Sequence, residues 1–553
     1  MTHDLDGPAA APAKAASGGF APLRHQVFLV LWVATVLGNT GVFVRDVASA
    51  WIVAELTNSP ATVALVQAAG FLPIFFLAIP AGVLSDIVDR RKLLIAIQVF
   101  LAGVSFTLML LAATGTITVT AIVTLTFLGG VGAALMSPTW QSIVPELVPR
   151  AELKNAVALN SLGFNIARAI GPALGGVMLA ALGASVTYGT DVATYLVVIA
   201  ALVWWRRNPD ADTALAERFT GAFRAGLRYA RASRDLHVVL LRAALFFAFA
   251  SNIWALLPLV ARNLLGGGAG FYGLLLGAVG AGAVVGAVLL PRLRQRFDSD
   301  ALLLGAALIA AVVMAGLSFG PPRWLAVLLL LVLGGGWIAA LTTLNGVAQA
   351  ILPNWVRGRG LAIYLTVFNG AMAAGSLAWG AVAHWAGVPA ALQIGGAGLV
   401  LVGLVAARIR LPAGEADLTP SNHWPEPLLA EPVENDRGPV KIVVEYRVPL
   451  AERPAFLAAL YGFCEQRRRD GAYAWWVAED AADPERIVEW FMVESWAEHL
   501  RQHRRVSKAD ATLQAELDRF RHDPGDGHGG AEHFLVLDPP RSAKGDPEGQ
   551  SGK

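Results

Sequence analysis

The sequence predicts an all-α membrane protein with twelve transmembrane helices in two six-helix halves, followed by a soluble α+β domain. The chain has 553 residues, of which 55% are hydrophobic and only 15% are charged, against roughly 25% in ordinary globular proteins. Charge is unevenly distributed, because residues 439–553 hold 36 charged side chains and the other 438 residues hold 48. The 57 glycines suit helices that pack closely in a bilayer.

Residues 1–22 are rich in alanine, proline and glycine. They lack a basic segment ahead of an apolar stretch, so we expect a disordered tail and not a signal peptide. The single cysteine, Cys464, excludes an internal disulfide framework and a cysteine-clustered metal site. The net charge of +2 does not indicate nucleic acid binding. The sequence predicts no cofactor, no metal site and no catalytic residue.

Twelve stretches are long enough to cross a hydrocarbon core of about 30 Å, which requires about 20 apolar residues per helix. The first half contains six predicted spans: 27–52, 61–84, 93–114, 117–140, 155–181 and 186–205. The second half contains six more: 237–262, 270–293, 301–319, 323–345, 361–386 and 389–408.

Basic residues in the loops predict the orientation of these spans. Loops after even-numbered helices carry 17 lysines and arginines, whereas loops after odd-numbered helices carry only Arg262 and Arg323. By the positive-inside rule, both termini of this multi-pass protein lie in the cytoplasm, on the inner side of the cell membrane. The predicted domains are a disordered cytoplasmic tail (1–22), a first bundle (23–205), a cytoplasmic linker (206–236), a second bundle (237–410), a linker (411–438), an α+β domain (439–540) and a disordered tail (541–553).

An internal repeat supports the division into halves. The Leu-Gly-Gly sequence at 128–130 returns at 333–335, 205 residues later. Three further pairs lie 204 residues apart: Asn165 and Asn369, Gly171 and Gly375, and Gly176 and Gly380. Parallel six-helix halves around a binding site at mid-membrane are the architecture of major facilitator transporters.

The segment Gly82-Val83-Leu84-Ser85-Asp86-Ile87-Val88-Asp89-Arg90-Arg91-Lys92 lies between the second and third predicted helices. It resembles the loop signature of the major facilitator superfamily. The resemblance implies a cytoplasmic gating latch formed by Gly82, Asp86, Arg90 and Arg91. Ile87 and Asp89 depart from the family pattern, which weakens the charge network of the latch. A plain basic turn, which needs only residues 90–92, is the alternative.

The fifth predicted helix contains Gly163-Phe164-Asn165-Ile166-Ala167-Arg168-Ala169-Ile170-Gly171-Pro172-Ala173-Leu174-Gly175-Gly176. This stretch resembles the glycine-proline signature of facilitator-type antiporters, in which Gly163, Gly171, Pro172, Gly175 and Gly176 carry the pattern. A proline removes a helical hydrogen bond and glycines allow tight packing. The resemblance implies export, while ordinary packing of small residues is the alternative reading.

Longer stretches at 51–60, 145–150 and 255–262 resemble the enterobactin-exporter-like branch of the superfamily, the transmembrane secretion effectors. The resemblance covers roughly residues 22–410. It implies a proton-driven exporter of small molecules, with siderophores or drugs as cargo classes. A proton symporter for uptake is the alternative. The sequence contains no phosphate-binding loop of the ATPase type, so an ion gradient or the cargo's own gradient must supply the energy.

Charged side chains within spans are costly in a bilayer and usually functional. Asp46 is our first candidate for the proton carrier and Asp191, early in the sixth helix, is the second. Arg45 neighbours Asp46 in sequence but points about 100° away on a helix. Arg168 lies about 20 Å into the fifth helix, where it can hold an anionic cargo. The amides of Asn165 and Asn369 are further cavity candidates.

Two simpler readings of these charges remain open. The charges can form a structural ion pair, and Asp46 or Asp191 can lie at the outer membrane interface. Either asparagine can hold helices together without touching cargo.

The tail predicts strand 440–448, helix 451–468, strands 472–480 and 486–495, helix 496–520 with a break near Val506, and strand 532–538. The sequence at 494–503 resembles antibiotic-biosynthesis-monooxygenase-like domains, which are ferredoxin-like folds that usually dimerise. It therefore implies a homodimer as one option. An enzyme would place Trp475, Trp476, His499 and His503 around a pocket; we favour a pairing or regulatory module.

Overall fold

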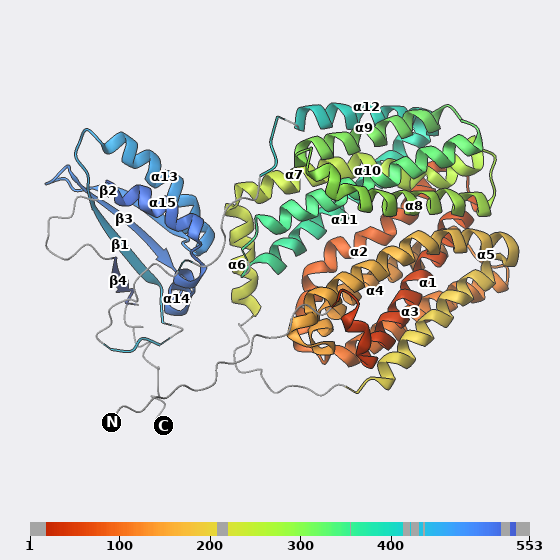
Figure 1. The fold of residues 1–553 in the computed structure, drawn as a ribbon, viewed down its shortest axis with the longest axis horizontal. Helices are drawn as coiled ribbons and strands as arrows, with labels where there is room; N and C mark the ends of the chain where they lie inside the picture. The colour runs from red at the N-terminus through yellow and green to blue at the C-terminus, as the bar shows by residue number, and fades with distance from the viewer. Residues whose placement is uncertain are drawn as a thin grey trace, which may run out of the picture. The chain divides into compact units, whose positions relative to one another are not determined.

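The computed structural model describes residues 18–206, 219–353, 355–406, 408–412, 421, 431–434, 437–520 and 531–537. The predicted tails therefore lie largely outside the described residues, as does much of both predicted linkers. The chain forms two compact units (Figure 1). The first comprises 1–213, 240–345 and 364–410, and the second comprises 214–239, 346–363 and 411–553.

The first unit holds most of the apolar helices and is called the membrane unit below. Its first half consists of long apolar helices, shown in red to yellow in Figure 1. They are preceded by a short 3₁₀ turn, η1 (Ala21–Arg24). The helices are α1 (Gln26–Leu56), α2 (Pro60–Ile87), α3 (Arg90–Ala113), α4 (Val119–Leu147) and α5 (Leu153–Trp204), with the turn η2 (Arg150–Glu152) before α5. Side-chain oxygens cap three of these helices at their N-termini, which satisfies otherwise unpaired amides: Ser59 for α2, Asp89 for α3 and Thr118 for α4.

Helix α5 accounts for the difference between the helix count and the predicted spans. Eleven helices among the described residues are long and apolar enough to cross a membrane, whereas the sequence predicts twelve spans. The 52-residue α5 contains Gly183 at φ 80° and ψ 175°, where two helices meet at a kink. The predicted spans 155–181 and 186–205 correspond to the two arms of α5 on either side of that glycine.

The second half contains α7 (Arg234–Leu259), which ends in the π-helical turn η3 (Val260–Leu264). The helices after it are α8 (Ala269–Arg294), α9 (Ser299–Ser318), α10 (Arg323–Ala350), α11 (Arg357–Ala386) and α12 (Val388–Ala406). All six coincide with predicted spans to within a few residues at most ends. The predicted multi-pass helical fold is therefore confirmed.

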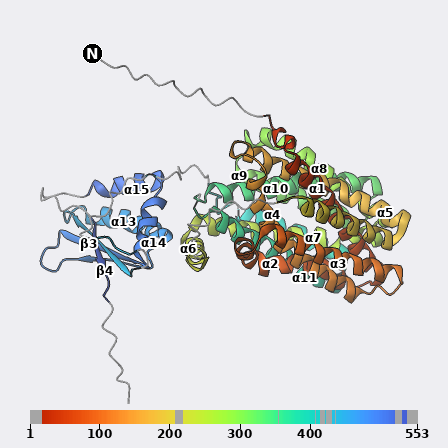
Figure 2. The same ribbon diagram turned by 90° about the horizontal axis from the view of Figure 1, so that it is seen from below.

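Glycines allow the two halves of the membrane unit to touch. Helix α5 packs on α1 and α3 in its own half and on α8 in the other half, as Figure 2 also shows. A Cβ atom added at Gly176 of α5 would lie 2.6 Å from the Cα of Gly273 in α8. One added at Gly380 of α11 would lie 2.5 Å from the Cβ of Ala64 in α2. Only glycine permits backbones to approach this closely.

The second unit contains a four-stranded antiparallel sheet in the order β2-β3-β1-β4. Its elements are β1 (Val440–Arg447), α13 (Arg453–Asp470), β2 (Ala474–Glu479), β3 (Arg486–Val493), α14 (Trp496–Arg505), α15 (Lys508–Asp518) and β4 (Glu532–Leu535). The predicted order of strands and helices is confirmed. So is the break near Val506, where Ser507 and Asp510 form a capping box that starts α15.

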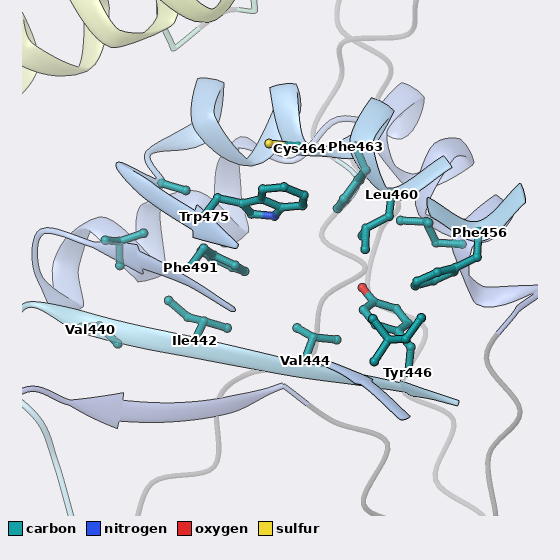
Figure 3. Packing of buried hydrophobic residues seen from close by; sticks show 14 of the residues in the cluster. Val440, Ile442, Val444, Tyr446, Phe456, Leu460, Phe463, Cys464, Trp475 and Phe491 are labelled. Carbon is teal, nitrogen blue, oxygen red and sulfur yellow. The ribbon is translucent and has the colours of Figure 1, made fainter. Parts of the chain in front are cut away.

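One face of this sheet forms a hydrophobic core against α13 (Figure 3). Alternate residues of β1 point into it, from Val440 to Tyr446, because successive strand side chains point to opposite faces. Phe456, Leu460 and Phe463 of α13 cover them. Helix α6 (Phe219–Ala232), within the predicted 206–236 linker, also belongs to this unit and packs against α13.

Candidate functional site

A buried ionic cluster lies between α1 and the second arm of α5. Nη2 of Arg45 is 3.0 Å from Oδ1 of Asp46, and Nη1 of Arg45 is 3.5 Å from Oδ2 of Asp191. Nη1 also donates to the hydroxyl of Tyr195 at 3.2 Å. One guanidinium therefore faces two carboxylates, and three of the six charged or amide candidates from the sequence lie together.

The two carboxylates differ in their surroundings. The side chain of Asp191 is 0% exposed and that of Asp46 is 50% exposed. Ser105 of α3 donates to Oδ2 of Asp191 at 2.6 Å, while Oδ1 has no hydrogen-bond partner among the described residues. Asp191 is thus enclosed by α1, α3 and α5. Arg45 and Asp46 are partners although they point about 100° apart on α1, because the Arg45 guanidinium turns toward the Asp46 carboxylate.

Arg168 lies apart from this cluster and reaches the other half of the membrane unit. Its Cζ is 5.9 Å from the ring centre of Trp337 in α10, within the range of a cation–π contact. No carboxylate pairs with Arg168 among the described residues. Trp254 and Phe247 pack on Trp337 at 5.1 and 5.4 Å, and the buried indole nitrogen of Trp337 has no acceptor among the described residues.

The two asparagine candidates bond within their own helices. Nδ2 of Asn165 donates to the carbonyl of Ser161 at 2.8 Å, and Nδ2 of Asn369 donates to that of Leu365 at 2.7 Å. Asn165 is exposed and Asn369 is buried. Asn165 of α5 and Asn369 of α11 correspond in the internal repeat, and each makes the same hydrogen bond to the carbonyl four residues earlier.

The basic residues of the predicted gating motif bind neighbouring helix ends in the first half. Nη1 of Arg90 is 2.8 Å from Oε1 of Glu146 in α4. Arg91 donates to the carbonyls of residues 202 and 203, at the end of α5, at 2.8 and 2.7 Å. Asp89, a departure from the family pattern, caps α3 by accepting from the amide of Lys92 at 2.9 Å. Gly82 lies in α2, and the side chain of Asp86 lies outside the described residues.

The helix 5 glycines face two different neighbours. Added Cβ atoms at Gly163, Gly171 and Gly175 would meet α1, at 2.7 Å from Val36, 2.6 Å from Phe43 and 2.9 Å from Val44. Gly176 faces α8 instead. Pro172 is buried between them. The motif therefore contacts two helices. Three of its glycines face α1 within the first half, and Gly176 faces α8 of the second half.

The grouping of four aromatic residues around a pocket in the soluble domain is wrong. Trp475 points into the core and donates to Oε1 of Glu489 at 2.8 Å, whereas Trp476 is 52% exposed on the opposite face. There Trp476 stacks on Trp490 at 4.4 Å. Neighbouring strand residues point to opposite faces, so these two indoles cannot line one pocket with the histidines.

Sequence reasoning missed a third histidine beside the other two. His499 and His503 of α14 have Nε2 atoms 3.2 Å apart, and His533 of β4 has its ring centre 4.5 Å from that of His499. Burial, with His533 and His503 beside it, lowers the pKa of His499 to about 3, so this ring is neutral. The i, i+4 spacing of the first two was the available signal, but the position of β4 depends on sheet pairing.

Sequence reasoning also missed the contacts that fix α6 in the second unit. Arg228 of α6 lies 2.6 Å from Glu494 and 3.0 Å from Glu498. Glu498 also pairs with Arg505 at 2.6 Å, and Arg505 stacks on Trp355 with 4.2 Å between Cζ and ring centre. Although burial opposes ionisation, Arg505 and Arg228 lower the pKa of Glu498. A carboxylate between two arginines thus joins three distant segments.

Comparison with known proteins identifies the family. A model of the transmembrane secretion effectors matches residues 17–537. The chain is 27% identical over 430 residues to the multidrug efflux pump Tap of Mycobacterium tuberculosis (strain ATCC 25618 / H37Rv), covering 72% of this chain and 96% of that protein. It is 22% identical over 283 residues to the staphyloferrin A transporter of Staphylococcus aureus (strain NCTC 8325 / PS 47), covering 50% of this chain and 70% of that protein.

Solved structures agree with this at the level of the fold. A bacterial homologue of the human lysosomal transporter Spinster, in an inward-facing and unoccupied conformation, superimposes with a TM-score of 0.55 at 16% identity. The match covers 71% of this chain and 97% of that one. The chain belongs to the transmembrane secretion effector family of major facilitator transporters.

Proposed function

We propose that this protein is a proton-coupled exporter of small molecules in the cytoplasmic membrane, with both termini in the cytoplasm. The observation that carries the proposal is the cluster in which one guanidinium, that of Arg45, faces the carboxylates of Asp46 and Asp191. The 17 basic residues in loops after even-numbered helices support the orientation. The names of the two curated relatives, an efflux pump and a siderophore transporter, support the cargo class.

The charge balance of the cluster explains how it can carry a proton. Two ionised carboxylates beside one guanidinium leave an excess negative charge in a region of low dielectric, which is costly. A proton on one carboxylate removes that excess. Asp191 is suited to hold it because it is fully buried and its Oδ1 has no partner among the described residues. Half-exposed Asp46 can relay the proton. The geometry thus favours Asp191 over Asp46, which the sequence placed first.

Arg168 and Trp337 are our proposed contacts for cargo. The guanidinium supplies a positive charge without a carboxylate partner among the described residues, and the indole N–H supplies a donor without an acceptor there. They lie on α5 and α10, which belong to different halves, so cargo that binds both would hold the halves together. A siderophore-like or drug-like molecule with an anionic or acceptor group and an apolar body fits this chemistry.

The contacts between the halves support an outwardly closed conformation. Gly176 against Gly273 and Gly380 against Ala64 lie near the helix ends that the proposed topology puts outside. Arg262 donates to the carbonyl of Ala54 and lies 3.4 Å from Asn58, also at that end. An alternating-access exporter collects cargo from the cytoplasm in such a state. We propose that Gly82, Asp86, Arg90 and Arg91 latch the cytoplasmic side in the opposite state.

We propose that the C-terminal domain is a ferredoxin-like fold, which its strand order β2-β3-β1-β4 supports, and that it pairs with a second copy of itself. The sheet face opposite the core exposes Trp476 and Phe534, at 52% and 49%. Trp476 is paired with Trp490 in the register, and Phe534 is paired with Lys441. Lys441 lies over Trp490 at 4.6 Å. An exposed aromatic patch of this kind is suited to an interface between copies.

Transport into inverted membrane vesicles tests the function. Vesicles that carry the wild-type protein should accumulate an anionic or drug-like substrate when their interior is acidified, as expected for export. Asp191→Asn should abolish the response to the pH gradient while cargo binding persists. Arg168→Ala should weaken binding of anionic cargo selectively, and Arg292→Ala, at an exposed position on α8, is the matched control. Cargo loss from vesicles driven by the same gradient would show uptake and overturn the export proposal.

A further inference from the structure

Three histidines from two elements of the C-terminal domain converge on one point. His499 and His503 lie one turn apart on the same face of α14, and His533 lies on β4. One ring nitrogen from each lies within 4.8 Å of the others. The ring centres of His499 and His503 are 4.6 Å apart. Residues that are 30 or more positions apart in the chain are thus held together by the pairing of β4 with β1.

The polar atoms of this group are incompletely satisfied. His499 is 2% exposed, and its Nε2 faces the Nε2 of His503 at 3.2 Å. The buried Nε2 of His533 has no hydrogen-bond partner among the described residues. A buried nitrogen without a partner costs free energy, and such a group in a native protein usually indicates a ligand or water. Packing alone explains the apolar contact of Trp496 with His499 at 5.3 Å but not this nitrogen.

We propose that His499, His503 and His533 form a binding site for a divalent first-row transition metal, with Zn²⁺ as the preferred ion. The group contains three imidazoles and no carboxylate or thiolate among the described residues. Nitrogen ligands favour Zn²⁺ and its neighbours over Mg²⁺ and Ca²⁺. Three histidines with a fourth position open to water are an established zinc arrangement.

The separations between the histidine nitrogens fit such an ion after a small movement of one ring. Zinc–nitrogen bonds of about 2.0–2.1 Å place tetrahedral ligand atoms about 3.3 Å from one another. The Nε2 atoms of His499 and His503 are already 3.2 Å apart. The third nitrogen, within 4.8 Å of the others, needs a shift of about an ångström, which rotation of the half-buried His533 ring can supply.

Charges around the group permit a dication. Arg467 is close enough to act on His499 electrostatically, but its Nε lies 3.3 Å from Oε1 of the fully buried Glu489. Its positive charge is therefore paired within the core. On the other side of α14, Glu498 is already held by Arg505 and Arg228. A bound metal would tie β4 to the helix that also holds α6.

Cobalt titration of the full-length protein tests the site. The protein is purified through a tag without histidine, stripped with a chelator and titrated with Co²⁺. We expect one Co²⁺ per chain with the visible absorption bands of a tetrahedral complex, lost on addition of one equivalent of Zn²⁺. Substitution of residues that only hydrogen-bond to metal ligands weakens metal affinity about 10–100-fold. His503→Gln and His533→Gln remove a ligand, so each should weaken the affinity more than about 100-fold.

Two further variants control this result. His384→Gln, at an exposed position on α11 in the membrane unit, should bind as the wild type does. His533→Cys should restore binding, because a thiolate also ligates Zn²⁺, and this rescue separates ligand loss from misfolding. Wild-type protein without stoichiometric Co²⁺ bands, or unchanged binding in both His503→Gln and His533→Gln, would overturn the proposal.

Discussion

Arg45 shows how one side chain organises the polar interior of the first half. Its guanidinium contacts Asp46, Asp191 and Tyr195. The sequence alone identifies both aspartates as unusual, because charges are rare within spans. It cannot show which of them are partners, since the pairing depends on how α1 packs against a helix about 150 residues later in the chain. A charge in a span can thus be recognised locally, while its partner cannot.

Removal of the guanidinium should destabilise the first half. In Arg45→Leu, both carboxylates lose their counter-charge, and breaking one side of a buried pair costs about 3–5 kcal/mol. We expect a lower thermal unfolding temperature in detergent and lower abundance in the membrane. The double variant Arg45→Leu with Asp191→Leu should recover part of the loss, as expected of coupled residues. Additive losses in the double variant would show that the two side chains act independently.

Asp470 gives a prediction about pH in the second unit. Burial raises its pKa from the ordinary 3.8 to about 6, although Arg469 opposes this. The folded state therefore holds the proton more tightly, so the associated stability is present below pH 3.8 and is lost as pH rises through 6. Asp470→Asn removes this dependence. Its stability relative to wild type should rise by up to about 3 kcal/mol between pH 4 and pH 7.

The single cysteine provides the measurement for that prediction. Cys464 is 6% exposed in the core of the same unit, so its rate of reaction with a thiol reagent reports opening of this core. The pH dependence of the thiol reaction itself is the same for both proteins. The ratio of the variant's rate to the wild-type rate at each pH therefore reports only the difference in core opening. A ratio of the two rates that does not change with pH would contradict the assigned role of Asp470.

At the scale of elements, α5 combines a predicted feature with an unpredicted one. Hydropathy predicts both of its spans, and the glycine-proline motif predicts close packing. The division of that packing between α1 and α8 was not predictable, because Gly175 and Gly176 are neighbours that face different halves. The same limit applies to α6: the sequence predicts only a linker there, because its partner α13 lies more than 200 residues later.

The α1-facing glycines should not tolerate a large side chain. Gly171→Leu and Gly175→Leu place Cβ atoms 2.6 Å from Phe43 and 2.9 Å from Val44, and overpacking of this kind costs about 1–3 kcal/mol or more. We expect transport to be abolished at normal or reduced expression. Gly103→Leu on α3, where a Cβ meets nothing within 4 Å, is the matched control. Equal transport by all three variants would exclude a special glycine face on α5.

Gly183 is not a suitable control for that experiment, although the sequence places it in an outer turn that should tolerate leucine. The structure leaves space around Gly183, but its φ of +80° with ψ of 175° lies in a region that is essentially restricted to glycine. A leucine there would cost about 1–3 kcal/mol. We therefore expect Gly183→Leu to reduce stability without the steric block that Gly171→Leu produces.

Gly176→Ala tests the contact between the halves. The added methyl group would lie 2.6 Å from the Cα of Gly273, so it should disfavour the conformation in which α5 and α8 touch. The balance should shift by about 1–3 kcal/mol toward the opposite state. Spin labels on α2 and α11 near Ala64 and Gly380 would measure this as a longer outer distance. An unchanged distance distribution would show that the Gly176–Gly273 contact does not control the conformation.

For the whole molecule, the second unit raises the question of what the C-terminal domain contributes. We expect deletion of residues 430–553 to leave the helices of the first unit folded and at least partly active, because the spans and both motifs precede residue 411. The deletion also removes Glu494, Arg469 and Arg505, which contact Arg228, Tyr229 and Trp355 respectively. Trypsin should then cleave α6 faster than in the intact protein, as measured by limited proteolysis of membrane vesicles.

A charge exchange separates this contact from a general loss of the domain. Glu498→Arg should expose α6 to trypsin as the deletion does, and Glu498→Arg with Arg228→Glu should restore part of the protection. A deletion that inserts normally and transports nothing would instead make the C-terminal domain part of the transport mechanism.

The contact between Arg228 and Glu494 also has a consequence during biosynthesis. The two residues are 266 positions apart, and at about 5–20 residues per second a ribosome needs tens of seconds to make the intervening chain. For that time α6 is complete while its partner helices do not exist. Its arginines can meanwhile bind the anionic headgroups of the membrane surface, with the apolar face of the helix toward the acyl chains. We therefore expect the membrane surface and the C-terminal domain to compete for α6 during synthesis, so ribosome stalling within the last hundred residues would favour α6 bound to the bilayer.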